Sequence, residues 1–291
     1  MPVAVAAAVA EETPRSAVVG VVWDGQPGVA PFLLDVLDGM RRRLGERGLD
    51  TLLLAPPVPA PGGDPGVYLR RARVLRLDGV VLLGVNPRDP AVETLAASDV
   101  PCVGVDVDIH GPRTAWLTSD NLGGAATAVR HLHSGGCRRI ATITGPMYLR
   151  PSVERLLGVR RELGVLGATL PAAYTVEGDL SAASGEAAMR RLLALPEPPD
   201  GVFVAGDAMA AGALLAVASA GLSVPGDVAV VGFDDAALAG YTRPRLTTVR
   251  QDAAAFARIA AELVTAVREA DVPPTVLPTE LVVRESCRVR R

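Results

Sequence analysis

Short apolar runs alternate with longer amphipathic stretches along most of the chain. The run 228–233 is interrupted only by Gly232, which is typical of a strand buried on both faces of a parallel sheet. The stretch 31–48 instead places Phe32 and Val36 at helical spacing and ends at a glycine. Strands that alternate with helices in this way predict a doubly wound α/β fold.

The alternation falls into two series, which predict two lobes. The expected strands are 17–23, 51–54, 79–83 and 102–105 in the first series, and 139–144, 174–176, 201–205 and 228–233 in the second. A helix over 251–270 and a strand over 277–283 follow. The fold class is therefore α/β, with two doubly wound parallel-sheet lobes joined by crossover strands near Ser119, Arg250 and Pro278. We assign residues 16–119 plus 251–276 to the N-terminal lobe and 120–250 plus 277–291 to the C-terminal lobe.

Two segments carry signals of irregular structure. Residues 1–15 form an alanine-rich arm that we expect to be disordered, and they lack the basic segment that begins a secretory signal. The loop 55–66 is so dense in proline and glycine that regular structure is excluded there. No stretch approaches the roughly 18 apolar residues of a membrane span. We therefore expect neither export nor association with a membrane.

Composition narrows the chemistry. The net charge of −3 and the pI near 5.7 give no global basic surface of the kind that a self-sufficient nucleic-acid binder shows. All 29 basic residues are arginine, so a lysine Schiff base and a P-loop lysine are both excluded. The sequence also lacks a GxSxG elbow. An enzyme is thus the least favoured of the functional classes.

Cysteine and histidine usage gives no sign of a disulfide framework or a metal site. Cys102, Cys137 and Cys287 are odd in number and far apart, which suits a reducing cytoplasm. His131 and His133 are two positions apart, so a helix points their rings in different directions. We expect a cytoplasmic protein with no metal ion and no cofactor.

Polar residues that directly follow predicted strands are the candidates for a binding site, because the carboxyl ends of parallel strands open onto the ligand crevice. Asp106, Asp207 and Asp234 hold such positions, and Arg155 lies near the start of a helix that follows a strand. Carboxylates accept hydrogen bonds from vicinal hydroxyls and a guanidinium donates in a rigid fork, so this set suits a neutral polyol such as a sugar. The alternatives are a helix cap for Asp207 and a solvated helix face for Arg155.

Several segments together resemble one known family. They are VGFDD followed by RPRLTTVRQD, SDNLGGAATAVRHLHSGGCRRIATITGP, RLLGVRRELGVLGA, GDLSAASG, AGDAMAAGALLAVASAGLSVPGD and LPTELVVRES. In order and separation they resemble the effector-binding core of the lac-repressor (LacI/GalR) family of bacterial transcription regulators, from Ser16 onward. The resemblance implies a periplasmic binding protein type I-like fold, a homodimer, and lobes that close on a sugar, a related polyol or a nucleoside.

The resemblance also implies which residues contact the effector. Arg155 stands three residues before Gly158, as in the R-x-x-G helix of the family, and Asp234 is the first acid of VGFDD. The full set of candidate effector-binding residues is Asp106, Arg155, Asp234, Asp207, Leu180, Trp23, Phe32 and Gln251. Core packing is the alternative for Trp23 and Phe32, and we expect Asp235 to be a local cap.

The chain departs from the family pattern at three places. Leu180 stands where the family often has an aromatic residue that stacks on the effector, and Gly206 stands where it is often polar. Both departures indicate a pocket with less stacking and fewer polar contacts. The family also carries a helix-turn-helix and hinge of about sixty residues before its core, and the arm 1–15 is too short for that fold. We expect DNA binding only where a helix-turn-helix lies upstream.

Two functional hypotheses remain at this stage. The leading one is the effector-sensing core of a LacI/GalR-type regulator, in which lobe closure is coupled to dimer geometry and, in the intact regulator, to DNA binding. The alternative is a solute-binding protein of a sugar transport system, which would need to be exported.

Overall fold

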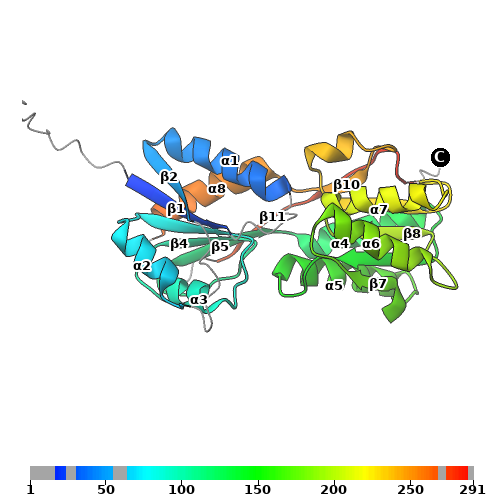
Figure 1. Cartoon of the computed structure of the whole chain (residues 1–291), viewed down its shortest axis with the longest axis horizontal. Helices are drawn as coiled ribbons and strands as arrows, with labels where there is room; N and C mark the ends of the chain where they lie inside the picture. The colour runs from blue at the N-terminus through cyan, green and yellow to red at the C-terminus, as the bar shows by residue number, and fades with distance from the viewer. Residues whose placement is uncertain (1–16, 24–30, 55–63, 268–272, 288–291) are drawn as a thin grey trace, which may run out of the picture.

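The structure is a computed structural model that describes residues 17–23, 31–54, 64–267 and 273–287. It consists of two lobes that lie side by side along the long axis of the molecule, each built on a six-stranded sheet (Figure 1). The predicted N-terminal arm and most of the predicted loop 55–66 lie outside the described residues.

The sheet of the first lobe has the strand order β11-β5-β4-β3-β1-β2, and every pairing in it is parallel. Its strands are β1 (Ala17–Trp23), β2 (Leu49–Leu54), β3 (Gly79–Leu83), β4 (Cys102–Val105), β5 (Thr114–Ser119) and β11 (Thr275–Leu277). Helices cover both faces, so β3 and β4 are buried along their whole length. One face packs against α1 (Pro31–Gly45) and α8 (Ala253–Ala266), and the other against α2 (Val67–Val74) and α3 (Pro90–Ala96).

The sheet of the second lobe has the order β12-β10-β9-β8-β6-β7. Its strands are β6 (Ile140–Thr144), β7 (Thr175–Glu177), β8 (Gly201–Val204), β9 (Ala229–Asp234), β10 (Thr247–Arg250) and β12 (Glu280–Val282). Its helical segments are α4 (Asn121–Ser134), α5 (Arg150–Val165), α6 (Ala182–Leu193), α7 (Asp207–Ser219), and the 3₁₀ turns η1 (Ala172–Tyr174) and η2 (Ala237–Gly240). Helix α4 packs against α5, and α6 against α7. The connections reverse direction at the edge strand β7, which puts these two helix pairs on opposite faces of the sheet.

The predicted pair of doubly wound parallel sheets is confirmed, with two differences of detail. The expected strand 277–283 is two short strands, because Pro278 interrupts it: β11 joins the first sheet, and β12 joins the second antiparallel to β10. The strand β5 was not among the expected elements.

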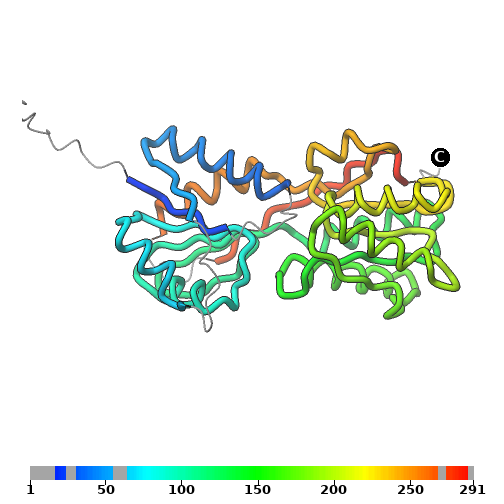
Figure 2. The backbone as a smooth tube through the Cα atoms, in the orientation of Figure 1, coloured from blue at the N-terminus to red at the C-terminus, as the bar shows by residue number. Residues whose placement is uncertain are grey.

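Three crossovers lie beside one another between the lobes (Figure 2). They run from β5 to α4, from β10 to α8 and from β11 to β12, close to the predicted crossings. The backbone N–H of Asp120 donates to the carbonyl of Leu277 at 2.8 Å, so two of the crossovers are hydrogen-bonded together. Since Leu277 pairs with Ser119 in the first sheet, the lobe boundary that we propose moves one residue along, to Pro278.

The described residues give two negative findings. None of their helices combines the length and the apolar composition that a bilayer crossing requires. Within the same part of the chain, no group of three or more His, Cys, Asp or Glu side chains is placed to hold a metal ion.

Candidate functional site

Predicted site residues from both lobes gather where the crossovers meet the two sheets. Asp106 follows β4 in the first lobe, whereas Arg155 in α5 and Asp234 at the end of β9 belong to the second. Gln251, in the crossover after β10, donates from Nε2 to Asp234 Oδ1 at 2.7 Å. All four side chains are at most 9% exposed. The structure thus brings together residues that are far apart in the sequence, as the strand-end argument predicts.

Arg155 is held as a fixed donor at the centre of this group. Its Nε donates to Asn121 Oδ1 at 2.8 Å and its Nη1 to the carbonyl of Ala205 at 2.7 Å. The guanidinium carbon lies 3.7 Å from the centre of the Phe233 ring. Burial lowers the pKa of Arg155, and the nearby carboxylates of Asp234 and others oppose that shift. The predicted alternative of a solvated helix face is therefore wrong.

The position of Arg155 depends on a close approach between two helices. A Cβ atom at Gly158 would lie 2.3 Å from the carbonyl oxygen of Leu122 and 3.0 Å from the Ala125 Cβ, so only glycine fits where α5 crosses α4. Gly158 is the glycine of the R-x-x-G motif. It lets α5 lie close enough to α4 for Arg155 to reach Asn121 at the start of that helix.

Asp234 is a buried acid in an unusual backbone conformation. Its φ is +120°, a value that costs free energy for a residue with a side chain and is typically retained at functional positions. Burial raises the pKa of Asp234 to about 6, although the charge of Arg155 and hydrogen bonds from Gln251 and the Asp207 backbone act in the opposite direction. A carboxyl with this pKa can change protonation just below neutral pH.

Asp106 is the acid that the first lobe contributes. Its φ of +58° turns the chain at the end of β4, and its Oδ1 accepts a hydrogen bond of 2.7 Å from the Thr118 hydroxyl. Burial raises the pKa of Asp106 above its usual value, although the charge of Arg155 and the Thr118 hydrogen bond act in the opposite direction. Because the charges of Asp106 and Arg155 interact, the site spans the two lobes.

Asp207 is not the helix cap that the sequence offered as the alternative to effector binding, and effector binding by Asp207 stays a prediction. It is the first residue of α7, and Gly206, which makes no side-chain capping bond, is the N-cap, so the predicted cap is wrong. Asp207 is fully buried: its Oδ1 accepts from the Thr248 hydroxyl at 2.6 Å and its Oδ2 from the Ala236 backbone N–H at 2.9 Å. Burial and the charge of Asp234 raise its pKa well above the usual value. We infer that Asp207 ties together the segments that carry Asp234.

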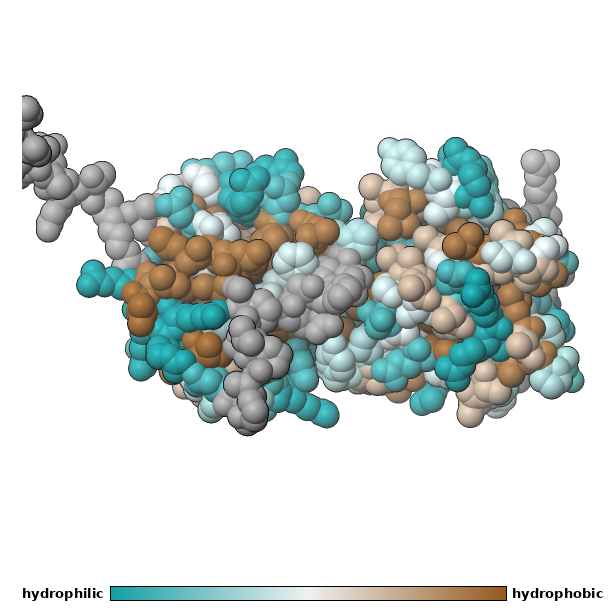
Figure 3. Space-filling view, viewed as in Figure 1, coloured by the Kyte–Doolittle hydropathy of each residue, from teal (hydrophilic) through white to brown (hydrophobic). Residues whose placement is uncertain are grey.

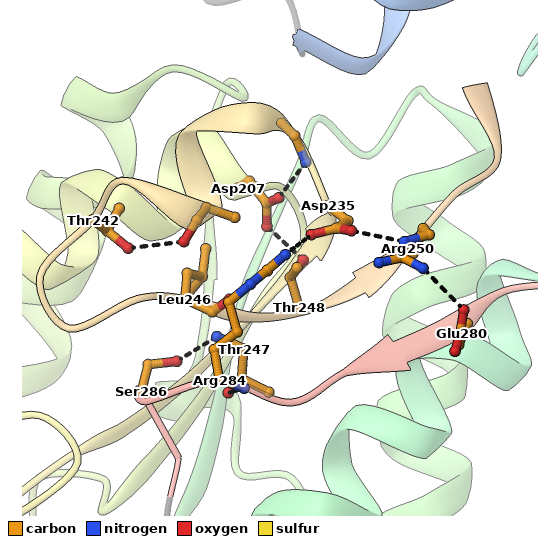
Figure 4. Close-up of polar contacts among 12 residues, drawn as sticks. Asp207, Asp235, Thr242, Leu246, Thr247, Thr248, Arg250, Glu280, Arg284 and Ser286 are labelled. Atoms are coloured by element: carbon orange, nitrogen blue, oxygen red, sulfur yellow. Dashed lines mark hydrogen bonds and ion pairs between the residues drawn. The ribbon is translucent and has the colours of Figure 1, made fainter. Parts of the chain in front are cut away.

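Asp235 is also not the local cap that the sequence suggested. Figure 4 shows its carboxylate between two arginines, Arg250 of β10 and Arg284, which follows β12. Arg250 also pairs with Glu280 at 3.2 Å. The N-cap of η2 is Ala236, without a side-chain bond. Asp235 therefore joins the end of β9 to the end of β10 and to the segment that follows β12.

Leu180 and Gly206 lie against the same space as Asp234. A Cβ at Gly206 would be 3.6 Å from Leu180 Cδ2 and 3.7 Å from Asp234 Oδ2. Leu180 has a φ of +72° at the turn before α6, which aims its side chain over Gly145 and Gly206. This wall of the site is aliphatic, in keeping with the departure that the sequence shows.

The two aromatic candidates of the first lobe, Trp23 and Phe32, differ in how deeply they are buried. Trp23, at the end of β1, is half-buried and packs beside the core of that lobe. The Phe32 ring is 3% exposed and meets the Phe256 ring edge-on at a centroid distance of 5.1 Å. This packing favours the core alternative for Phe32, so the structure does not bring it to the group around Arg155.

Asn121, Ser119 and Phe233 belong to the site but were not among the candidates. Asn121 orients Arg155, the Ser119 hydroxyl donates to Gln251 Oε1 at 2.7 Å, and Phe233 supports the guanidinium. The sequence signal for Asn121 and Ser119 is the triplet SDN, which fits a helix cap. Asp120 provides that cap by accepting from the Gly123 N–H, and this leaves its two neighbours for the site.

The fold and the site define a class of protein. Residues 129–287 match the family model described as a periplasmic binding protein-like domain. The chain belongs to the LacI/GalR family of transcriptional regulators, and it contains the effector-binding core of that family. The family is one of transcriptional regulators and not of enzymes, which favours the regulator hypothesis over the solute-binding protein of a transport system.

Two relatives and one solved structure illustrate the relationship. The transcriptional regulator CelR of Thermobifida fusca is 36% identical over 261 residues, which cover 88% of this chain and 76% of CelR. The ribose operon repressor of Escherichia coli (strain K12) is 35% identical over 225 residues, 76% of this chain and 67% of the repressor. The solved structure of a CelR–cellobiose complex superimposes with a TM-score of 0.81 at 33% identity, covering 94% of this chain and 84% of that one.

Proposed function

We propose that the group around Arg155 binds a neutral, polyhydroxylated effector, and that the two lobes close on it. The observation that supports this proposal is the buried set of Asp106, Arg155 and Asp234, which draws on both lobes beside the crossovers. Carboxylates accept hydrogen bonds from neighbouring hydroxyls, and the guanidinium donates to a ring or hydroxyl oxygen. A ligand held by both lobes favours the arrangement in which they are close together.

The balance of charge argues for a neutral ligand over an anionic one. The acids that act on the single buried guanidinium are four: Asp234, Asp106, Asp207 and Glu154. A phosphate or carboxylate in this site would meet more negative than positive charge in a region of low dielectric. We therefore expect sugars and related polyols to bind in preference to sugar phosphates or uronic acids.

The relatives supply the first compounds to test. A solved CelR structure contains cellobiose, and another relative represses a ribose operon. Leu180 in this chain offers an aliphatic surface and not an aromatic ring, so the preferred sugar can differ from those of the relatives. Nucleosides remain in the set of compounds to test.

A thermal-shift screen tests the proposal directly. Purified protein is heated with cellobiose, ribose, other neutral sugars, nucleosides, sugar phosphates and uronic acids. A neutral sugar that binds the folded state raises the melting temperature in a concentration-dependent way. The shift should disappear in Arg155→Ala and Asp234→Ala and persist in Arg161→Ala, an exposed arginine of the same helix. A shift that survives in both site variants would place the ligand elsewhere.

We also propose that the chain acts as a homodimer in the cytoplasm and binds DNA when a helix-turn-helix lies upstream of this core. An apolar surface of the first lobe supports the dimer. Leu52, Leu53, Val74 and Leu75 are exposed side chains of the edge strand β2 and the neighbouring α2 region. Figure 3 shows apolar side chains gathered over this part of the molecule. An exposed apolar edge of this kind favours association with a second chain.

A further inference from the structure

Arg150 contacts the first lobe although it belongs to the second. It is the first residue of α5, and its guanidinium carbon lies 4.6 Å from the centre of the Trp116 ring in β5. Its Nη1 is 3.5 Å from Asp108 Oδ2, in the segment that follows β4. A cation–π contact and an ion pair therefore cross from one lobe to the other.

Arg150 is tied to the site as well as to the first lobe. Its Nε donates to Glu154 Oε1 at 2.7 Å, and Glu154 Oε2 accepts from Asn121 Nδ2 at 3.2 Å. Asn121 in turn holds the guanidinium of Arg155. A continuous set of polar contacts thus joins the Trp116 face of the first lobe to the buried arginine. An isolated ion pair at the surface is worth little, but a set that shares partners is more selective for one geometry.

The geometry of α5 makes this contact relevant to the site. Arg150 and Arg155 lie five residues apart on one helix, a separation of roughly 7.5 Å along its axis. A helix is rigid over that length, so holding its first residue against the first lobe fixes where Arg155 stands relative to Asp106. A rotation of the lobes about the crossovers pulls Arg150 away from Trp116 and Asp108.

We propose that Arg150 is an interlobe clasp, which joins α5 to Trp116 and Asp108 and sets the population of the lobe arrangement in which Arg155 faces Asp106. It acts as a positioning residue, since it reaches the site through Glu154 and Asn121. The clasp works in the absence of any ligand. A test of the clasp therefore does not depend on the proposal that the effector is a neutral sugar.

Distance measurements on the ligand-free protein test the clasp. One spin label is attached at Glu93→Cys in α3 of the first lobe and one at Arg160→Cys in α5, both exposed positions. The native cysteines are buried, and burial raises the pKa of Cys102 and Cys287 to about 12, so they resist labelling. Labelled protein is diluted with excess unlabelled protein, so that few dimers contain more than one labelled chain. Double electron–electron resonance then gives the distribution of distances between the lobes.

We expect Arg150→Met to add longer distances to this distribution. Because a cation–π contact at a partly exposed site is lost, the ratio of open to closed lobes should rise about two- to fivefold. Arg150→Lys keeps the charge and should restore much of the closed population. Arg161→Met is the matched control, because Arg161 is exposed on the same helix and should leave the distribution unchanged.

Two results would overturn the clasp. One is an unchanged distribution in a folded Arg150→Met protein, with folding checked by circular dichroism and melting temperature. The other is an equal shift in Arg161→Met. If Arg150→Met does not fold, Asp108→Asn tests the same contact from the first lobe and should shift the distances in the same direction. Acrylamide quenching adds an independent readout, because opening the clasp should uncover Trp116, which is 7% exposed.

Discussion

At the scale of single residues, the properties of the site depend on how far burial raises the pKa of its acids. Asp234 and Asp207 lie close enough for the charge of one to raise the pKa of the other, and burial is the larger cause for both. Arg155 opposes this effect at Asp234. The site can therefore hold a carboxyl whose protonation responds to mild changes in pH.

The first prediction concerns effector binding as a function of pH. If the ionised form of Asp234 accepts hydrogen bonds from the effector, affinity should be constant above its pKa of about 6 and fall up to about tenfold for each pH unit below it. Isothermal titration with the sugar found in the screen, between pH 5 and 8, measures this dependence. Asp234→Asn should bind weakly and with little dependence on pH over that range. An affinity that rises as the pH falls below 6 would contradict the role given to this carboxylate.

The raised pKa of Asp234 changes the free energy of unfolding in the opposite direction: stability falls as the pH rises. Because the folded-state pKa of Asp234 lies above the unfolded value near 4, the folded state holds this proton more tightly. Its contribution to the free energy of unfolding is greatest below about pH 4 and is lost as the pH rises to about 6. Asp234→Asn should remove this contribution from the pH dependence of unfolding in urea.

The second prediction concerns Asp207. Thr248→Val removes the hydroxyl that donates to Asp207 Oδ1 and leaves a buried oxygen without that donor. We expect the free energy of unfolding to fall by about 1–3 kcal/mol. Thr94→Val, in a half-buried position of α3, is the control and should change it by less than about 0.5 kcal/mol. Equal effects in urea denaturation would show that Asp207 does not depend on Thr248.

The sequence predicted the site residues that follow strands better than it predicted their partners. Asp106, Asp234 and Arg155 come together because parallel strands end at a common edge, a rule that strand positions alone can apply. The cap expected for Asp235 and the cap alternative for Asp207 were both wrong, because the partners of these acids, Arg284 and Thr248, are distant in the sequence. Local spacing can reveal a cap but not a contact made by tertiary packing.

At the scale of elements, close packing between helices limits what each position tolerates. Helix α5 touches α4 at Gly158, where an added methyl group meets a backbone carbonyl that cannot move alone. Gly164, near the end of α5, has no described atom within 4 Å of such a group. The same substitution should therefore have opposite effects at the two positions.

The third prediction compares these two glycines. Gly158→Ala should force α5 away from α4, lower the free energy of unfolding by about 1–3 kcal/mol and weaken effector binding through Arg155. Gly164→Ala should leave binding intact and raise the free energy of unfolding by up to about 1 kcal/mol, because alanine favours the helix. Urea denaturation and isothermal titration measure both. A neutral Gly158→Ala would mean that the two helices are not in close contact.

Periodicity predicted most elements, and it failed where an element is short or uneven. The strand β5, TAWLTS, was missed because no helix separates it from β4 and because its polar threonines and serine resemble a loop. All its residues are buried, and Thr118 and Ser119 serve the site and the crossover. The strands β11 and β12 have three residues each, too few for a period to be recognised.

At the scale of the whole molecule, the edge of the first lobe formed by β2 and α2 leaves apolar side chains exposed in a single chain. Leu53 is 52% exposed and Val74 is 75% exposed, both large enough to matter for association. A partner that covers this edge would also fix the orientation of two first lobes relative to each other. Closure of the lobes in one chain would then change the position of the partner chain.

The fourth prediction concerns the oligomeric state. Leu53→Glu combined with Val74→Glu should convert a dimer into a monomer, because two charges would enter the apolar surface. Light scattering coupled to size-exclusion chromatography measures the mass. Leu157→Glu, at a side chain 47% exposed on the second lobe, should leave the mass unchanged. A wild-type protein that is monomeric at micromolar concentration would contradict the dimer.

The placement of β11 and β12 has a consequence for synthesis on the ribosome. Each sheet takes an edge strand from the last part of the described chain, and α8 returns to the first lobe after the second has been made. A nascent chain therefore cannot complete its N-terminal lobe until the intervening residues emerge, which takes on the order of ten seconds. During that interval the face of the first sheet that α8 will cover is open to chaperones, and chains stalled before residue 253 should be markedly sensitive to protease.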